Sequence, residues 1–326
     1  MRKEKHRTEF IELKGKKIMS KLITFLKLAK TPRKLVRPMA SNGLINWMSD
    51  ETFIKLVFKA SFGYELDLDN PKTFNEKLQW LKLYNRRPEY TMMVDKYRVR
   101  DYIREKIGEE YLIPLLNVWN SVEEIDFDTL PNQFVLKCNH DQGSVVICKD
   151  KSTFDVEAAK QKLARKLKRN HYWSIREWPY KNVKPCIICE QYMQDDGGKE
   201  ELSDYKVLCF NGEPKLIEVH RGRFGGGHTQ DIYDIDWNKT DYHQPDVPTT
   251  DEVMNKPVFA EEMILLSRKL SEGIPHVRVD WYYANDHLYF SELTFYDGSG
   301  FDPFMDNQDM EIGSMLVLPE KYNEML

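Results

Sequence analysis

Alternating apolar and polar positions predict a β-hairpin near the carboxyl end of the chain. Val277, Val279 and Trp281 alternate with polar residues, which is the period-2 pattern of a half-buried strand. A turn follows, and a second alternating segment covers residues 288–295. The length of the loop matters, because a one-residue slip turns every side chain to the other face of the sheet.

Two loop lengths give this hairpin two different faces. A two-residue loop would set Asp280 opposite Ser291, whereas a three-residue loop over residues 285–287 would set it opposite Glu292. Three-residue hairpins are common and accept Asn or Asp in the left-handed conformation. We therefore expect the three-residue loop.

In that register two carboxylates share one face of the sheet. Asp280 and Glu292 would lie about 5 Å apart across the strands, where like charges repel unless a cation joins them. Carboxylates without a thiol or imidazole partner suit Mg²⁺, and the same register sets Arg278 opposite Thr294. On this evidence alone, an ordinary charge cluster on a solvated sheet face remains the alternative.

The earlier part of the chain changes from helical to strand patterns. Residues 47–108 have helical periodicity, including a capping box from Thr73 to Glu76. Residues 134–148 predict a hairpin whose polar loop, residues 139–144, could lie over phosphates through its backbone N–H groups. Further on we expect a two-residue turn at Asn211-Gly212 and helices over residues 156–170 and 261–270.

Composition indicates a soluble globular protein with an uneven charge. Hydrophobic residues make up 41% of the 326 residues and charged residues 31%. Residues 1–40 hold 13 Lys and Arg against three Glu, a net charge of +10, so the remainder carries −14 to give the overall −4. An acidic body argues against nucleic acid as a partner.

The cysteines and the amino-terminal segment bear on location. We expect the five cysteines to be buried thiols of a reduced cytoplasmic protein, and Cys186-x-x-Cys189 lacks a second pair for zinc. No secretory signal or membrane-spanning run is recognisable. Residues 17–30, followed by the basic residues up to Arg37, predict an amphipathic helix for peripheral contact with the inner membrane face. A partner-bound or unstructured basic tail is the alternative.

Five motifs carry a family resemblance. They are T-F-N-E-K-L-Q-W-L-K from Thr73, L-K-C-N-H-D-Q-G from Leu136, D-Y-K-V-L-C-F-N-G-E from Asp204, R-V-D-W-Y from Arg278 and Y-F-S-E-L-T-F from Tyr289. Together they resemble the ATP-grasp superfamily, most closely its teichuronopeptide-biosynthesis (TupA-like) branch among bacterial surface-polysaccharide proteins. The resemblance implies an α+β fold in which two lobes grip ATP.

The resemblance also implies a division of the chain. We expect a basic amphipathic segment over residues 1–45, a mostly helical region over 46–133, a small ATP-grasp lobe over 134–195 and a large lobe with the metal site over 196–326.

Site residues follow from matching each motif. The nucleotide contacts implied are Lys96, Lys137, Gly143, Ser144, Glu190, Gln191, Tyr192, Met193, Asp204 and Lys206. The implied Mg²⁺ ligands are Asp280, Glu292 and Thr294, the last standing where many members have Asn. Asp141 stands where a glycine is expected in the phosphate loop.

The implied reaction is ATP- and Mg²⁺-dependent ligation of a carboxylate to an amine through an acylphosphate. Catalysis would rest on Lys206, Arg278 and His140, although His140 is as readily a structural loop histidine. Arg221 and Arg223 would bind an acidic substrate, such as an acidic sugar of a capsule polysaccharide or its lipid-linked precursor, to be amidated by an amino acid or amine.

Two other classes of function stay open at this point. A glycosyltransferase of the same kind of pathway would use a D-x-D motif, with candidates at Asp126/Asp128 and Asp234/Asp236. A non-catalytic nucleotide-binding scaffold would tolerate Asp280→Asn in its cellular role. The oligomeric state is not predicted.

Overall fold

A computed structural model of the chain describes residues 36, 39–40, 42–194, 203–222, 227–305 and 307–322. The amphipathic segment expected over residues 17–30 lies outside these ranges. Among the described helices, none has the length and apolar character needed to cross a bilayer.

The first part of the described chain is helical, as the periodicity predicts. Its helices are α3 (Asp50–Phe62), α4 (Phe74–Tyr84), α5 (Glu89–Val94) and α6 (Val99–Lys106). The capping box that begins α4 is confirmed, because the Thr73 side chain accepts from the Glu76 backbone N–H and the Glu76 side chain accepts from that of Thr73.

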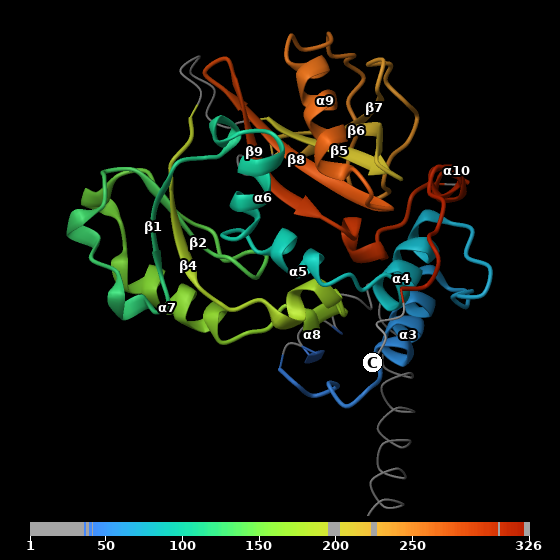
Figure 1. The fold of residues 1–326 in the computed structure, drawn as a ribbon, viewed down its shortest axis with the longest axis horizontal. Coiled ribbons are helices and arrows are strands. Elements are labelled where there is room, and N and C mark those ends of the chain that lie inside the picture. The colour runs from blue at the N-terminus through green and yellow to red at the C-terminus, as the bar shows by residue number, and fades with distance from the viewer. Residues whose placement is uncertain are drawn as a thin grey trace, which may run out of the picture.

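A four-stranded antiparallel sheet forms the small lobe (Figure 1). Its order is β1 (Leu115–Trp119), β4 (Ile187–Gln191), β2 (Phe134–Cys138) and β3 (Val146–Cys148). The β2–β3 hairpin is as predicted, whereas β1 lies in the region that was expected to be mostly helical. Helix α7 (Val156–Leu167) packs on β2, and the short α8 (Tyr172–Ile175) follows.

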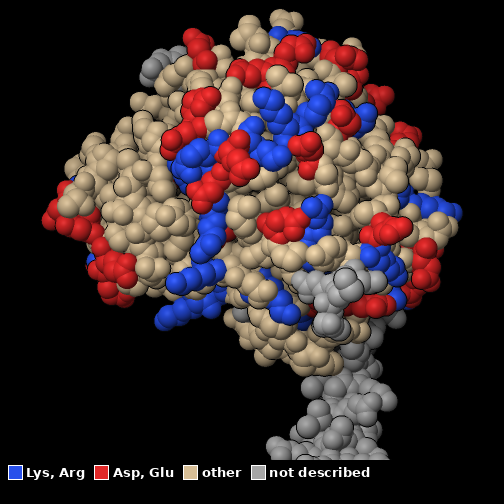
Figure 2. Space-filling view, viewed as in Figure 1, with Lys and Arg blue, Asp and Glu red and all other residues tan. Residues whose placement is uncertain are grey.

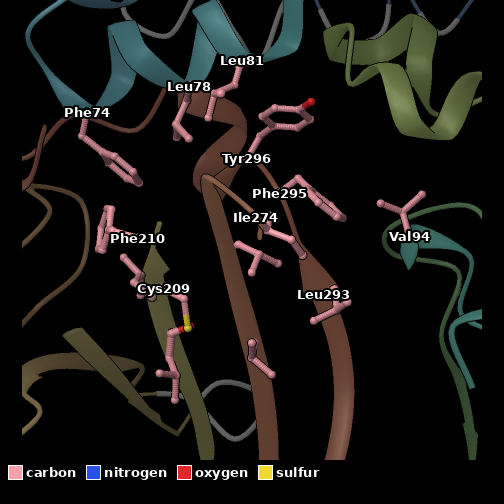
Figure 3. Packing of buried hydrophobic residues seen from close by; sticks show 14 of the residues in the cluster. Phe74, Leu78, Leu81, Val94, Cys209, Phe210, Ile274, Leu293, Phe295 and Tyr296 are labelled. Carbon is pink, nitrogen blue, oxygen red and sulfur yellow. The ribbon is translucent and has the colours of Figure 1, made fainter. Parts of the chain in front are cut away.

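A five-stranded antiparallel sheet forms the large lobe. Its order is β7 (Thr229–Asp234), β6 (Glu213–Arg221), β5 (Asp204–Phe210), β8 (His276–Ala284) and β9 (His287–Thr294). Helix α9 (Ala260–Ser271) packs against β5, β6 and β8. Near one end of the sheet, α4 is in contact with α10 (Gln308–Ser314), and Phe74 of α4 meets Phe210 edge to face (Figure 3).

The β8–β9 hairpin has the predicted facing residues but a different loop. Ala284 pairs with His287, so the loop is only Asn285 and Asp286, with φ values of 53° and 58°. Positive φ at both positions is the geometry of a type I′ turn. The prediction of a three-residue loop was therefore wrong.

A β-bulge restores the predicted register further along this hairpin. Trp281 pairs with Phe290, and the next pair is Asp280 with Glu292, so Ser291 is the extra residue. A bulge of this kind places two residues opposite one and shifts the pairing by one position. Asp280 thus lies opposite Glu292, and Arg278 opposite Thr294, as predicted.

The cysteines also match the expectation. All five are free and buried. Burial raises the pKa of the Cys186 and Cys189 thiols to about 12. The division into four segments stays a prediction.

Candidate functional site

A cavity of about 640 Å³ lies between the two sheets, a volume within the range of small-molecule sites. One wall comes from the small lobe and the segments beside it, the other from the large sheet. The residues that line this cavity include Lys96, Lys137, Asp141, Gly143, Ser144, Lys206, Glu218, His220, His228, Gln230, Arg278, Ser291, Glu292, Thr294 and Asp297. Figure 2 shows lysine and arginine side chains gathered in a band along the boundary between the small lobe and the rest of the molecule.

A single row of charged residues crosses the large sheet. Glu218 of β6 pairs with Lys206 of β5, Lys206 with Asp280 of β8, and Asp280 with Glu292 of β9. Directly paired residues project to the same face of a sheet. The alternation of each strand therefore places these four side chains together on the cavity side.

Asp280 is the buried centre of this row. Its carboxylate accepts two bonds of 2.7 Å from the Arg278 guanidinium and one of 2.8 Å from the Lys206 ammonium. Lys206 also pairs with Asp204 at 3.1 Å. Burial lowers the pKa of Lys206, but the two carboxylates outweigh this effect and the net shift is upward. Lys206 is therefore a fixed positive charge.

Arg278 is held by a second carboxylate from just beyond β9. Asp297, in the short 3₁₀ segment Asp297–Gly300, forms an ion pair with it. Burial lowers the pKa of Arg278, yet Asp280 and Asp297 raise it well above its ordinary value. The guanidinium also donates to the Thr294 hydroxyl at 3.3 Å, so the predicted catalytic arginine and Thr294 are in contact.

Glu292 is the most accessible carboxylate of the predicted metal set. Its side chain is 28% exposed, against 2% for Asp280, and it pairs with Lys96 at 3.1 Å. Burial raises the pKa of Glu292, but Lys96, Lys206 and Arg278 outweigh burial and bring it to about 2. Glu292 is thus an anion throughout the neutral range, facing the cavity.

The oxygen atoms of the predicted metal set are of the type that Mg²⁺ prefers as ligands. Carboxylate and hydroxyl oxygens are the ligands of this ion, which keeps several waters and binds through one or two carboxylates plus substrate phosphates. Among the described residues, no cluster of three or more His, Cys, Asp or Glu side chains is arranged to hold a metal by itself. The site therefore fits an ion that arrives with phosphate oxygens, with Glu292 as its open protein ligand.

The small lobe and the segment between α5 and α6 contribute further cations and a backbone loop. Lys137 of β2 pairs with Glu190 of β4 at 2.6 Å, which ties two predicted nucleotide contacts together. Lys96 donates to the carbonyl of Asp141 at 3.1 Å. Gly143 and Ser144 line the cavity, and Gly143 has a φ of 80° that favours glycine.

Several predicted nucleotide contacts are not among the residues that line the cavity. The described cavity lining does not include Glu190, Gln191, Tyr192, Met193 or Asp204. Gln191 closes β4 and its backbone N–H donates to the carbonyl of Pro114 at 2.9 Å.

His140 is a structural residue of the loop rather than a cavity-lining one. It is buried, with Nε2 2.9 Å from the carbonyl of Arg169 and Nδ1 3.2 Å from the side-chain oxygen of Asn139. Burial lowers its pKa. The alternative interpretation, a satisfied loop histidine, is the one that its contacts favour.

Arg221, one of the two predicted substrate arginines, does not line the cavity. Arg221 donates to Asp231 at 2.5 Å and to the Thr250 hydroxyl at 3.0 Å, and it is not part of the described lining. Arg223 lies outside the described residues.

The D-x-D candidates have local structural roles. The Asp126 carboxylate accepts from the backbone N–H of Asp128, and that of Asp234 accepts from Asp236. These bonds are typical of Asx-turns, so neither motif needs a metal to explain it.

Several cavity residues were missed from the sequence. Asp297 begins the 3₁₀ segment after β9, and the others, Glu218, His220, His228 and Gln230, come from β6, β7 and the segment before β7. Glu218 and His220 alternate with the apolar Ile217 and Val219 on β6, and this alternation was an available signal for a polar face of the strand.

The family described as TupA-like ATPgrasp matches residues 76–317. A search of curated proteins gave no match. Solved structures with a similar fold include a D-alanine–D-alanine ligase from Bacillus anthracis complexed with ATP, at 17% identity and a TM-score of 0.37, covering 63% of this chain and 55% of that one.

Two further solved structures show a similarly low sequence identity and TM-score. The D-alanine–D-alanine ligase from Helicobacter pylori has 12% identity and a TM-score of 0.39, covering 69% of this chain and 62% of that one. A RimK domain ATP-grasp protein from Sphaerobacter thermophilus has 11% identity and a TM-score of 0.39, covering 76% and 72%. This chain thus spans less than two thirds of the length of the ligases, and the likeness is too distant to indicate what it binds.

Proposed function

The chain belongs to the TupA-like ATP-grasp family, a family of ATP-dependent ligases, and we propose that it joins a carboxylate to an amine at the expense of ATP and Mg²⁺. The observation that carries this proposal is that Lys206 and Glu292, which flank the buried Asp280 in the sheet, line one cavity together with Lys96 and Lys137. Cations from two lobes around an open carboxylate are what a triphosphate with its metal ion requires.

The reaction proceeds in two steps. The substrate carboxylate attacks the γ-phosphorus of ATP, which forms an acylphosphate and releases ADP. The amine then attacks the acyl carbon, the C–O bond to phosphate breaks, and an amide and inorganic phosphate result. No protein nucleophile is required, so the chain contributes position and charge.

The described residues have separate tasks in this scheme. Lys137 and Lys96 hold the phosphates from the small-lobe side, and Lys206 balances their charge from the large sheet. Glu292, Asp280 and Thr294 are the residues that would hold Mg²⁺, which when bound would neutralise phosphate oxygens. Arg278, kept protonated by two carboxylates, stabilises the oxyanion that forms when the amine adds.

The acid is proposed to be an acidic sugar of a bacterial surface polysaccharide or its lipid-linked precursor. Support comes from the TupA-like branch itself and from the basic residues 1–40, whose net charge of +10 suits an anionic membrane surface. Cytoplasmic location with peripheral contact at the inner membrane face belongs to the same proposal.

A phosphate-release assay tests the proposal. The full chain is incubated with Mg-ATP, uronic-acid oligosaccharides and amino acids, with each substrate omitted in turn. ADP and phosphate are expected only when acid and amine are both present. Transfer from a nucleotide sugar without ATP would instead identify a glycosyltransferase and overturn the ligase.

A further inference from the structure

One end of the cavity is made by β6 and the residues leading into β7, away from the lysines of the small lobe. Glu218, His220, His228 and Gln230 line it. Glu218 and His220 are two residues apart on β6, and Gln230 pairs directly with His220. These side chains therefore share the face of the sheet that carries Lys206 and Asp280.

Two buried acceptor atoms at this end have no hydrogen-bond partner among the described residues. They are Oε1 of Glu218 and the side-chain oxygen of Gln230. Glu218 is 2% exposed and Gln230 3% exposed. A buried acceptor left unpaired is unfavourable, and more so when it is charged, so both atoms indicate a missing hydrogen-bond donor.

The other carboxylate oxygen of Glu218 is oriented by a pair of histidines. His220 Nε2 lies 3.3 Å from Oε2 of Glu218, and His220 Nδ1 lies 2.9 Å from Nε2 of His228. The rings of His220 and His228 are stacked, with centroids 5.2 Å apart. Glu218 is therefore held on one side while Oε1 stays available to a ligand.

Lys206, the neighbouring cation, does not supply the missing hydrogen-bond donor. Lys206 is opposite Glu218 in the sheet, but its ammonium bonds to Asp280 and pairs with Asp204 instead. An anionic ligand would meet the Glu218 carboxylate and the side-chain oxygen of Gln230, and like charges repel. The chemistry that fits is a positively charged donor of several hydrogen bonds.

We propose that Glu218, Gln230 and the His220–His228 pair form the binding site for the amine substrate, taken as a primary ammonium. This inference rests on the proposed ligase and assigns the amine to the β6–β7 end of the cavity. Two of the ammonium N–H groups bond to Oε1 of Glu218 and to the oxygen of Gln230.

Glu218 is also placed to activate the amine. It removes one proton from the ammonium, which frees the nitrogen lone pair for attack on the acyl carbon. The C–N bond forms as the C–O bond to phosphate breaks, a second N–H proton leaves with the phosphate as HPO₄²⁻, and the third stays on the amide. The proton on Glu218 returns to solvent, so charge and atoms balance.

Binding is tested without ATP. The histidine side-chain resonances of the full ¹⁵N-labelled chain are followed by NMR during titration with methylammonium chloride, and separately with tetramethylammonium chloride, which has no N–H donor. We expect saturable shifts of His220 and His228 with methylammonium only. Equal responses to both salts, or no response, would overturn the site.

Matched variants separate this site from a general salt effect. Glu218→Gln should abolish the methylammonium response, whereas Glu213→Gln, the same change at an exposed position of β6, should retain it. Because Glu218→Gln could disturb folding, Gln230→Glu is the second variant: an added carboxylate should tighten methylammonium binding several-fold. Weaker binding by Gln230→Glu would contradict the assignment.

A kinetic comparison distinguishes this inference from the ligase proposal. Hydroxylamine is largely neutral near pH 7 and needs no carboxylate to activate it. With Mg-ATP and a uronic-acid oligosaccharide, the rate that Glu218→Gln loses with glycine as the amine should exceed the rate that it loses with hydroxylamine by at least about tenfold. Equal losses with both amines would overturn the role of Glu218, and absence of hydroxamate with the wild type would count against the ligase alone, since the titration needs no ATP.

Discussion

Glu292 is the carboxylate on which the positive charges of the cavity act together. Its side chain is partly exposed and faces the cavity. The charges of three cations keep it ionised, although its partial burial favours the neutral form. Replacing its charge should remove the open ligand of the proposed metal ion while leaving the shape of the side chain nearly unchanged.

We therefore expect Glu292→Gln to lower turnover by at least about 100-fold, the size of effect seen when one electrostatic contact of a reaction centre is removed. Phosphate release with both substrates present is the measurement. Glu213→Gln serves as the control and should stay near wild type. A rate within twofold of wild type for Glu292→Gln would show that this carboxylate does not carry the metal.

The lowered pKa of Glu292 has a defined consequence for stability. Its folded pKa is about 2, below the ordinary value of 4.5, so the unfolded chain binds more protons in that interval and stability is lost as pH falls. From pH 5 down to pH 2, we expect the wild type to lose about 1–3 kcal/mol more than Glu292→Gln. Urea unfolding at several pH values measures this, and parallel curves would contradict it.

At the scale of the elements, the turn of the β8–β9 hairpin stores a small conformational cost. Asp286 has a φ of 58°, a region that costs a non-glycine residue about 1–2 kcal/mol, less for Asp or Asn. Asp286→Gly should raise the free energy of unfolding by about 0.5 kcal/mol, and Asp286→Ala should lower it by about 1 kcal/mol. The opposite order in denaturant unfolding would argue against the type I′ turn.

The same hairpin shows what sequence reasoning could and could not reach. The facing of Asp280 and Glu292 was predicted correctly from a wrong loop, because the bulge at Ser291 makes up the missing residue. The bulge had left a trace: the buried positions on β9 are Leu288 and Phe290, and the next is Leu293. Two residues, Ser291 and Glu292, lie between Phe290 and Leu293, where strict alternation has only one.

Elements that depend on distant partners were harder to predict. Strand β1 is short and pairs with β4, some 70 residues later in the chain, so no local turn signal marked it. His140 gave the same difficulty, since its bond to the carbonyl of Arg169 follows from tertiary packing that no local pattern encodes. Local motifs identified which residues are polar, but not which of them face the cavity.

At the scale of the molecule, the proposed nucleotide site depends on both lobes at once. Lys137 comes from the four-stranded sheet and Lys206 from the five-stranded sheet, and both line the cavity. Mg-ATP at about 100 times its dissociation constant should stabilise the chain by about 2.7 kcal/mol, which raises the melting temperature by roughly 5 °C.

Lys137→Met and Lys206→Met should each remove most of this thermal shift, because each lobe holds the phosphates by its own cation. Lys215→Met, at an exposed position of β6, is the control and should keep the shift. The shift, rather than the melting temperature itself, is compared, since Lys206 also pairs with Asp280. A full shift in either cavity variant would mean that one lobe binds the nucleotide alone.

The bulge at Ser291 affects how this hairpin should be compared with others. A hairpin with a three-residue turn and an unbroken ladder would present the same pair of carboxylates as this one, with its two-residue turn and one extra residue inside the strand. An insertion at the tip and a deletion at position 291 would cancel each other. When two such sequences are superimposed, the gap belongs within the strand at Ser291, and placing it in the turn would misalign the residues between the two positions.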